Sequence, residues 1–258
     1  MKKLKYFLTI ASMLLLSGCF EINEDIDVQA GGKGVFSVHT NMSKLLEAMQ
    51  SYLGKEEMDK QMPQKNIDTT VSMKTLTDTA RNITAENKEL IKNGTVHLKL
   101  NIEQKDFRTD IVIPFKSLSD LQKLYNSMNN QSLGYNDLFK GMAGKTDSSS
   151  SGNENGMPDM NQFNAIYDFV SRDGLISRKL NQEKWKTLQN SQQFAQMKQA
   201  GTMGIAIPYT LTISLPRPAK KVDNALAKLF PDRKKVIIQY NLMEVFDHPE
   251  QFEYTIAY

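Results

Sequence analysis

Cysteine is almost missing from this sequence: Cys19 is the only one among 258 residues. A lone thiol excludes an internal disulfide and a thiolate zinc site. Histidine is nearly as scarce, and its three copies, His39, His97 and His248, lie far apart without an HExxH pair. His39 and His97 fall in predicted strands and could converge in the fold, but their spacing predicts no metal site and no cofactor.

Catalytic motifs are missing as well. There is no GxSxG elbow, and the glycine-rich stretch 31–34 leads into a predicted strand, which favours a turn over a phosphate loop. Residues 147–152 begin like a calcium loop, but Pro158 takes the place of the bidentate carboxylate. Carboxylate pairs such as Asp25 and Asp27 are typical of solvated surface charges. We therefore expect no catalytic residues and no enzymatic activity.

An excess of charge is missing from most of the chain. Lys and Arg number 32 against 29 Asp and Glu, but three of the lysines, Lys2, Lys3 and Lys5, lie at the very start. Without them the count is 29 against 29. A neutral chain lacks the basic footprint of a nucleic-acid-binding protein, so we expect no nucleic-acid partner.

Long hydrophobic runs are limited to residues 6–16, which are too few to span a bilayer comfortably. The lysines, this apolar run and the small residues after it are the three parts of a secretory signal. The stretch Leu16-Ser17-Gly18-Cys19 resembles the lipobox of bacterial lipoproteins. That resemblance implies cleavage between Gly18 and Cys19, and attachment of diacylglyceryl and fatty acyl chains such as palmitate to Cys19.

The implied anchor places the protein in the bacterial cell envelope. Several acyl chains hold a protein stably at a membrane, so the mature chain would be anchored to the membrane and would not span it. In the best-known envelopes, aspartate after the lipidated cysteine retains a lipoprotein in the inner membrane. Phe20 occupies that position here, which favours the outer membrane over the inner one.

Alternation of apolar and polar residues at a period of two predicts most of the mature chain's strands. It indicates hairpins at 22–39, 96–115 and 163–180, and further strands at 205–215, 236–242 and 252–258. Such strands are typical of antiparallel sheets with one wet face. We predict an α+β fold with helices packed on one face of the sheet, in two halves of similar element order, 19–129 and 163–258. Residues 1–18 form the signal peptide, and a Ser-, Gly-, Asn- and Met-rich linker spans 130–162.

Helical spacing between the predicted strands marks a stripe of apolar residues, Met42, Leu45, Leu46, Met49 and Leu53. Asn41 is expected as its N-cap and Gly54 as its end. Further helices are predicted near 76–91, 117–128 and 181–200. The stripe could form one wall of a site for an apolar ligand, because methionine-rich faces adapt to varied ligands, or it could simply fill the core.

A second resemblance lies near the C-terminus. A strand ends in Leu215-Pro216, a loop carries Asn224, and the charged turn 232–235 starts the next strand. This pattern, with the strand–glycine turn–strand after Cys19, resembles the LppM-type lipoprotein domain. The resemblance implies an α+β envelope lipoprotein without enzymatic activity, with apolar or glycan ligands.

The sequence therefore favours a lipid-anchored cell-envelope protein that acts as a non-enzymatic binding or interaction module, possibly for an apolar ligand. The alternative is a structural or assembly factor that docks on an envelope protein complex through a sheet edge or through the linker near Phe139. A hydrolase would need two acids about 5 to 10 Å apart in a cleft, and no motif points to them.

Overall fold

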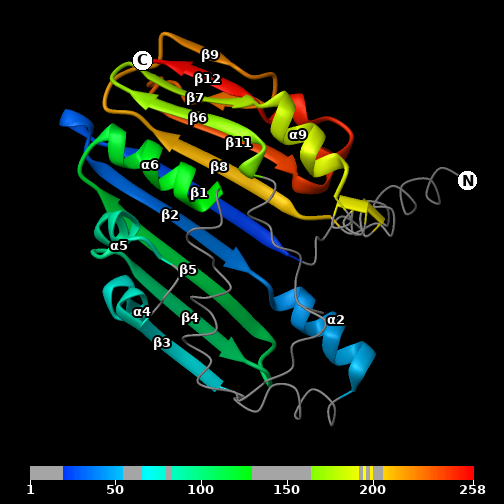
Figure 1. Ribbon diagram of the computed structural model, residues 1–258. Helices are drawn as coiled ribbons and strands as arrows, with labels where there is room; N and C mark the ends of the chain where they lie inside the picture. Colours follow the sequence, from blue (N-terminus) through cyan, green and yellow to red (C-terminus); the bar gives the residue numbers. More distant parts are fainter. Residues whose placement is uncertain are drawn as a thin grey trace, which may run out of the picture.

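The computed structural model describes residues 20–54, 66–79, 83–129, 164–191, 194–195, 198–199 and 206–258. These residues form an α+β fold of two mainly antiparallel sheets with helices, as the alternating patterns predict (Figure 1). The signal peptide, the lipobox and the whole predicted linker 130–162 lie outside the described residues. None of the described helices is long and apolar enough to cross a membrane.

Sheet A has eight strands. In spatial order they are β10 (Ala227–Leu229), β11 (Lys235–Asn241), β8 (Pro208–Ser214), β1 (Glu21–Val28), β2 (Gly34–Asn41), β5 (Asp106–Phe115), β4 (Thr95–Asn101) and β3 (Asn66–Ser72). All neighbouring strands are antiparallel except β1 and β8, which are parallel. Strands from both sides of the predicted linker therefore share one sheet, and the two segments do not form separate sheets.

Sheet B has four antiparallel strands: β6 (Tyr167–Arg172), β7 (Leu175–Leu180), β12 (Tyr254–Ala257) and β9 (Lys221–Asp223). The three predicted hairpins are present as β1–β2, β4–β5 and β6–β7. The short 3-10 helix η2 (Ala30–Gly32) closes the first hairpin, and Gly31 and Gly32 there have φ values of 83° and 80°. Glycine tolerates these values best, so this glycine cluster acts as a turn.

The α-helices are α2 (Ser43–Leu53), α4 (Met73–Thr79), α5 (Ala85–Ile91), α6 (Leu118–Asn129) and α9 (Gln182–Gln189), and 3-10 helices η3 (Leu242–Phe246) and η4 (Pro249–Phe252) follow β11. At the start of α6, the Ser117 hydroxyl accepts a hydrogen bond from the Asp120 amide at 3.1 Å. The prediction that Asn41 is the N-cap of α2 is wrong: Met42 holds that position, and the Asn41 side chain instead accepts from the Ser43 amide at 3.1 Å. Of the helix predicted at 181–200, α9 covers Gln182–Gln189; Asn190 leaves helical geometry, and residues 194–195 and 198–199 are helical again.

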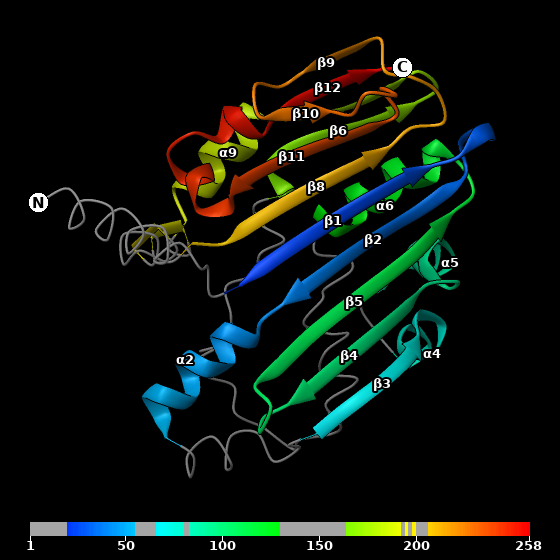
Figure 2. The same ribbon diagram turned by 180° about the vertical axis from the view of Figure 1, so that it is seen from behind.

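The two faces of sheet A differ. Sheet B and helices α4, α5 and α6 lie over one face, called the inner face (Figure 1). One apolar core joins residues of both sheets and these helices, among them Leu121, Leu211 and Ile256, each fully buried. Seen from behind, the strands of sheet A present their other face, the outer face, with none of the described helices over it (Figure 2). Side chains of alternating residues therefore divide into buried and solvated sets.

Gly34, at the start of β2, tests how closely the first hairpin packs. A Cβ atom there would lie 1.9 Å from the Asp27 carbonyl oxygen and 2.5 Å from the Phe115 ring. The Asp27 backbone cannot move away without distorting the hairpin. Gly34→Ala should therefore lower the free energy of unfolding, measured by urea denaturation, by about 1–3 kcal/mol. Ser37→Ala, on the outer face of the same strand, is the control and should change it by less than about 0.5 kcal/mol. Equal stability of the two variants would contradict this packing.

Candidate functional site

The outer face of sheet A carries an ordered row of acids and imidazoles. Five neighbouring strands contribute one residue each: Asp25 from β1, His39 from β2, Asp110 from β5, His97 from β4 and Asp68 from β3. Each alternates along its strand with residues that face inward, so all five side chains lie on the outer face. We call this row the outer-face ladder.

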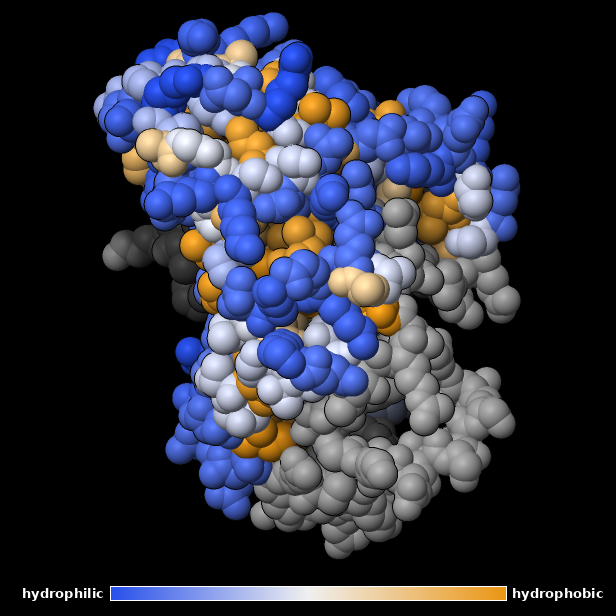
Figure 3. All heavy atoms as spheres, turned by 60° about the vertical axis from the view of Figure 1, so that its left-hand side comes forward, coloured by the Kyte–Doolittle hydropathy of each residue, from blue (hydrophilic) through white to orange (hydrophobic). Residues whose placement is uncertain are grey.

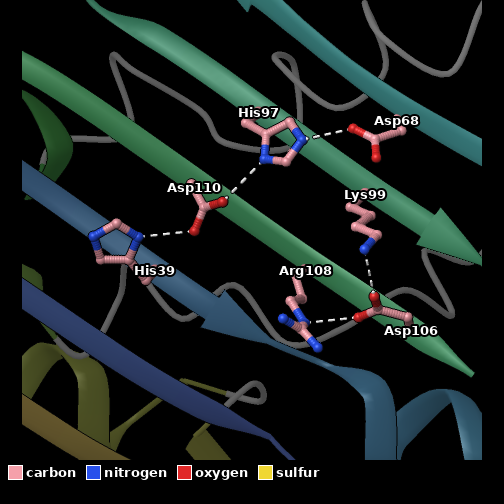
Figure 4. Close-up of polar contacts among 7 residues, drawn as sticks. All are labelled: His39, Asp68, His97, Lys99, Asp106, Arg108 and Asp110. Carbon is pink, nitrogen blue, oxygen red and sulfur yellow. Dashed lines mark hydrogen bonds and ion pairs between the residues drawn. The ribbon is translucent and has the colours of Figure 1, made fainter.

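The register of β2, β5 and β4 brings three residues of the ladder into contact at its centre. His39 and His97 are both directly opposite Asp110 on its two neighbouring strands. The Nδ1 atom of His39 lies 2.8 Å from one carboxylate oxygen of Asp110, and Nδ1 of His97 lies 3.1 Å from the other (Figure 4). Nε2 of His97 lies 2.9 Å from an oxygen of Asp68, and Nε2 of His39 lies 3.9 Å from Asp25.

These contacts favour the charged form of His97. Hydrogen bonds to Asp68 and then to Asp110 raise its pKa above the ordinary value of 6.5, because both ring nitrogens can donate only in the imidazolium. Partial burial acts to raise the pKa of Asp110, but the two imidazoles outweigh it and lower that pKa below 3.8. The contacts therefore favour the imidazolium of His97 within a hydrogen-bonded array at mildly acidic pH.

A second, shorter row runs beside the ladder. The side chain of Asp106 is 13% exposed and lies between two cations, with the Lys99 Nζ atom at 3.0 Å and the Arg108 Nε atom at 2.7 Å (Figure 4). Further along the face, β1 and β8 present Asn23, Asp25, Thr210 and Thr212 opposite one another. The outer face is thus a broad polar surface in which charges of both signs have fixed partners.

The ladder does not have the arrangement of a metal centre. Its imidazole nitrogens face carboxylates, which fixes them as donors instead of ligands. Among the described residues, no three His, Cys, Asp or Glu side chains converge in a way that could hold a metal ion.

A second polar cluster is buried between the two sheets. Glu24, on the inner face of β1, is 3% exposed, and one of its oxygens accepts a hydrogen bond from the Tyr209 hydroxyl of β8. Arg178 of β7 is also 3% exposed; its Nη2 donates to the Tyr240 hydroxyl at 3.0 Å and its Nε donates to the Phe252 carbonyl at 3.0 Å. The guanidinium lies over the rings of Tyr167 and Tyr254, at 4.9 and 5.2 Å.

The buried position of Glu24 disfavours the charged form of its carboxylate. Burial raises its pKa from 4.5 to about 7, although the Tyr209 hydrogen bond and the Arg178 charge act to lower it. Its Oε1 atom is buried without a hydrogen-bond partner. Since no solvent reaches the cluster, it acts on the fit between the sheets and not on a ligand.

The predicted apolar stripe lies on α2. Leu46 is 1% exposed and packs with Leu100 and Ile102 of the β4–β5 hairpin, and Met49 is packed against the same cluster. Met42 is buried and Leu45 is half-buried, while the side chain of Leu53 is not described. An apolar ligand at this stripe stays a prediction, with core packing accounting for the contacts of Leu46.

Among the described residues, a cavity of about 460 Å³ opens on the surface at another place. It lies where the β1–β2 turn meets the start of α6, and Leu118, Arg217 and Tyr258 are among the residues that line it. Figure 3 views the molecule from the side on which this turn lies, where hydrophilic side chains dominate and apolar patches are small. Arg217 is held at the rim by an ion pair of 2.7 Å with Asp173.

Comparison with models of protein families, with curated proteins and with solved structures finds no match to this chain. The lipobox and LppM-type resemblances therefore stay predictions. The ladder itself was missed by sequence reasoning. Its signal is the placement of His39, His97 and Asp110 at the polar positions of strands, but only the strand order shows that these positions adjoin.

The contacts of His97 in the ladder predict the pH range in which this residue stabilises the fold. His97 gains its partners on folding, so its contribution to stability is complete below pH 6.5 and is lost as pH rises through its raised pKa. Asp110→Asn should lower the pKa of His97, measured by NMR titration of its ring protons, because one carboxylate acceptor is removed. The matched control is Asp168→Asn, which breaks an ion pair with Lys184 in another part of the fold. An unchanged His97 titration in D110N would contradict the ladder.

Glu24 predicts a loss of stability of the same sign, but in a lower pH range. Its folded pKa is raised, so the folded protein binds the proton more tightly and loses stability as pH rises from 4.5 to about 7. One proton gives a slope of about 1.4 kcal/mol per pH unit. The difference in unfolding free energy between wild type and Glu24→Gln should follow this slope in urea titrations at several pH values. Glu183→Gln, at an exposed position of α9, should show no such slope; a flat difference for E24Q would refute the assignment.

Proposed function

We propose that this protein is a lipid-anchored protein of the bacterial cell envelope that binds a macromolecular partner, without catalysis, on the outer face of sheet A. The observation that carries the proposal is the ladder on a face that no described helix covers. Five aligned side chains with fixed partners form a preorganised polar surface. Charged side chains that serve only to keep a protein soluble need no fixed partners. The fixed arrangement of these five side chains on an open face therefore favours a role in binding a partner.

The shape of the face favours a large partner over a small ligand. Small molecules bind in concave, mainly apolar sites, whereas protein partners bind broad surfaces with a polar rim. The outer face carries mainly polar side chains, Thr, Asn, Asp, His and Lys among them, on a continuous sheet, with single apolar residues such as Val112 and Ile237. Another envelope protein is therefore the partner class that fits best, and a ligand at the α2 stripe is the less favoured reading.

The membrane anchor rests on the sequence. A basic start, an apolar run of residues 6–16 and Leu16-Ser17-Gly18-Cys19 support lipidation of Cys19 and exposure to the envelope. The first strand begins at Glu21, so only Phe20 separates the proposed lipid from the sheet. An anchor this close would hold the fold at the membrane surface, with the outer-membrane location favoured by Phe20.

Lipidation is tested with an alkyne fatty acid in the bacterium that encodes the protein. The wild-type chain should take up the label and lose residues 1–18, giving a smaller mass. Cys19→Ala should take up no label and keep the precursor mass, because the thiol that receives the lipid is gone. Phe20→Ala is the control and should still be labelled. Labelling of C19A equal to wild type would contradict the anchor.

Partner binding is tested by photocrosslinking in intact cells. A photoreactive residue at Thr212, in the middle of the outer face, should give a discrete crosslinked protein band identified by mass spectrometry. The same residue at the exposed position Glu183 of α9 should not give that band. Asp110→Asn should weaken the band at least several-fold, because it removes the carboxylate that joins the two imidazoles. A band of equal strength from both positions, or none from Thr212, would count against the outer face as the binding surface.

A further inference from the structure

The positive charge of the chain is concentrated in one segment. Residues 217–235 contain seven Lys and Arg and two Asp, a net charge of +5. Since Lys and Arg equal Asp and Glu beyond residue 18, at 29 each, the rest of that chain carries 22 against 27, a net charge of −5. The overall neutrality therefore hides a strongly basic region opposed to an acidic remainder.

Four lysines of this segment have free charges. Lys220, Lys228, Lys234 and Lys235 are exposed, and no acidic side chain of the described residues forms an ion pair with them. Lys228 contacts only the neutral Gln239 side chain, at 3.3 Å. The acids nearest in sequence are Asp223, paired with Lys221 at 3.8 Å, and Asp232, which accepts from the Lys234 amide at 3.0 Å.

Two large apolar side chains project among these lysines. Leu226 is 37% exposed and Phe230 is 43% exposed. They flank the short strand β10, and exposure alternates over residues 226–230, with Leu226, Lys228 and Phe230 exposed and residues 227 and 229 half-buried. The Nζ atom of Lys235 lies 5.6 Å from the centre of the Phe230 ring. Figure 2 shows β10 beside β11 at one edge of sheet A.

The loops that carry these apolar residues are firmly held. The Phe230 amide donates to the Lys235 carbonyl at 3.0 Å, and the Arg233 guanidinium donates to the carbonyls of Ala219 and Lys220 at 2.7 and 3.1 Å. On the other side, Asn224 accepts from the Leu226 amide at 2.8 Å and donates to the Glu253 carbonyl at 2.7 Å. Leu226 and Phe230 are thus displayed to solvent by built turns and not by loose chain.

We propose that Leu226, Lys228, Phe230, Lys234 and Lys235 form a contact surface for a bilayer containing anionic phospholipid. The lysines bind lipid phosphates, and the two apolar side chains enter the headgroup boundary between them. Basic residues around exposed aliphatic and aromatic side chains are the pattern that binds anionic membranes, since electrostatic attraction and apolar burial add. A soluble polyanion would use the lysines alone and leave both apolar side chains in water.

The position of this surface agrees with an anchored chain. Strand register places Ala227 in one row with Ile238, Leu211 and Glu24, three strands from β1. Leu226 is therefore only about 14 Å across the sheet from β1, whose first residues follow Cys19. If Cys19 is lipidated as proposed above, one bilayer can meet both points. The contact surface does not depend on that anchor, because its charges and apolar groups belong to the folded chain.

The experiment uses the chain from Phe20 to Tyr258, which holds every described residue and no anchor. Flotation is compared between vesicles of pure phosphatidylcholine and vesicles with equal parts of phosphatidylcholine and phosphatidylglycerol. We expect binding to the anionic vesicles, weakened by salt, and little binding to the neutral ones. Lys228, Lys234 and Lys235 changed together to Gln should weaken it about a hundredfold, from about fivefold per charge. Leu226→Ser with Phe230→Ser should weaken it at least tenfold.

Matched controls separate this surface from general stickiness. Tyr52→Ser removes the most exposed aromatic side chain, on α2, and Lys33, Lys44 and Lys116 changed together to Gln remove three exposed charges elsewhere. Both should bind like wild type, and circular dichroism should show every variant folded. Equal binding to neutral vesicles, equal loss in the controls, or no loss in L226S/F230S would overturn the proposal. If L226S/F230S lost no binding and heparin displaced the protein fully from the anionic vesicles, the surface would be a polyanion site. A failure of Cys19 labelling would not change the interpretation of the flotation experiment.

Discussion

The parallel pairing of β1 with β8 is the constraint on which both polar features of this fold depend. Strand β1 is central in sheet A, with the antiparallel hairpin partner β2 on one side and β8, nearly two hundred residues later, on the other. Its inner side chains enter the buried cluster through Glu24, and its outer ones reach the ladder through Asp25. A slip of one residue would exchange these two sets. Pairing with β8 and core burial of Ile22, Ile26 and Val28 together fix the register.

The buried cluster shows why the two sheets must meet in one way. Removing a carboxylate and a guanidinium from water costs several kcal/mol for each ion, and replacement by apolar residues is often stabilising. Here Arg178 recovers part of that cost from two hydrogen bonds and two aromatic faces, whereas Glu24 recovers less and keeps an unpartnered oxygen. A shifted packing of sheet B on sheet A would break the Arg178–Tyr240 hydrogen bond, because Tyr240 belongs to β11 of sheet A, whereas Tyr167 and Tyr254 belong to sheet B. The cluster therefore selects one arrangement more than it adds stability.

Much of the fold was predictable from sequence, because it rests on local signals. Period-two alternation found the hairpins and β8, β11 and β12, and Ser117 marked the start of α6. Strands β9 and β10 were not predicted because each has only three residues, too few to show alternation. Strand β3 was not predicted because its sequence, NIDTTVS, is mostly polar, and as an edge strand it has no fully buried side chain. The ladder could not be predicted without the strand order, and that order depends on contacts between residues far apart in the sequence. His39 and His97 were noted as possible neighbours, but Asp110, which joins them, carried no local signal.

The outer face of sheet A is divided along its width, and the division gives its two proposed contacts separate places. At the β10 edge, Leu226, Lys228 and Phe230 are basic and apolar; across β2, β5, β4 and β3, the ladder is acid and imidazole with every nitrogen of His97 paired. A negative membrane attracts the first region and repels the second, whose carboxylates outnumber its imidazoles. If both proposals hold, contact with the lipid is made at the β10 edge, while the net negative ladder is repelled from the lipid and stays available to a partner in the envelope.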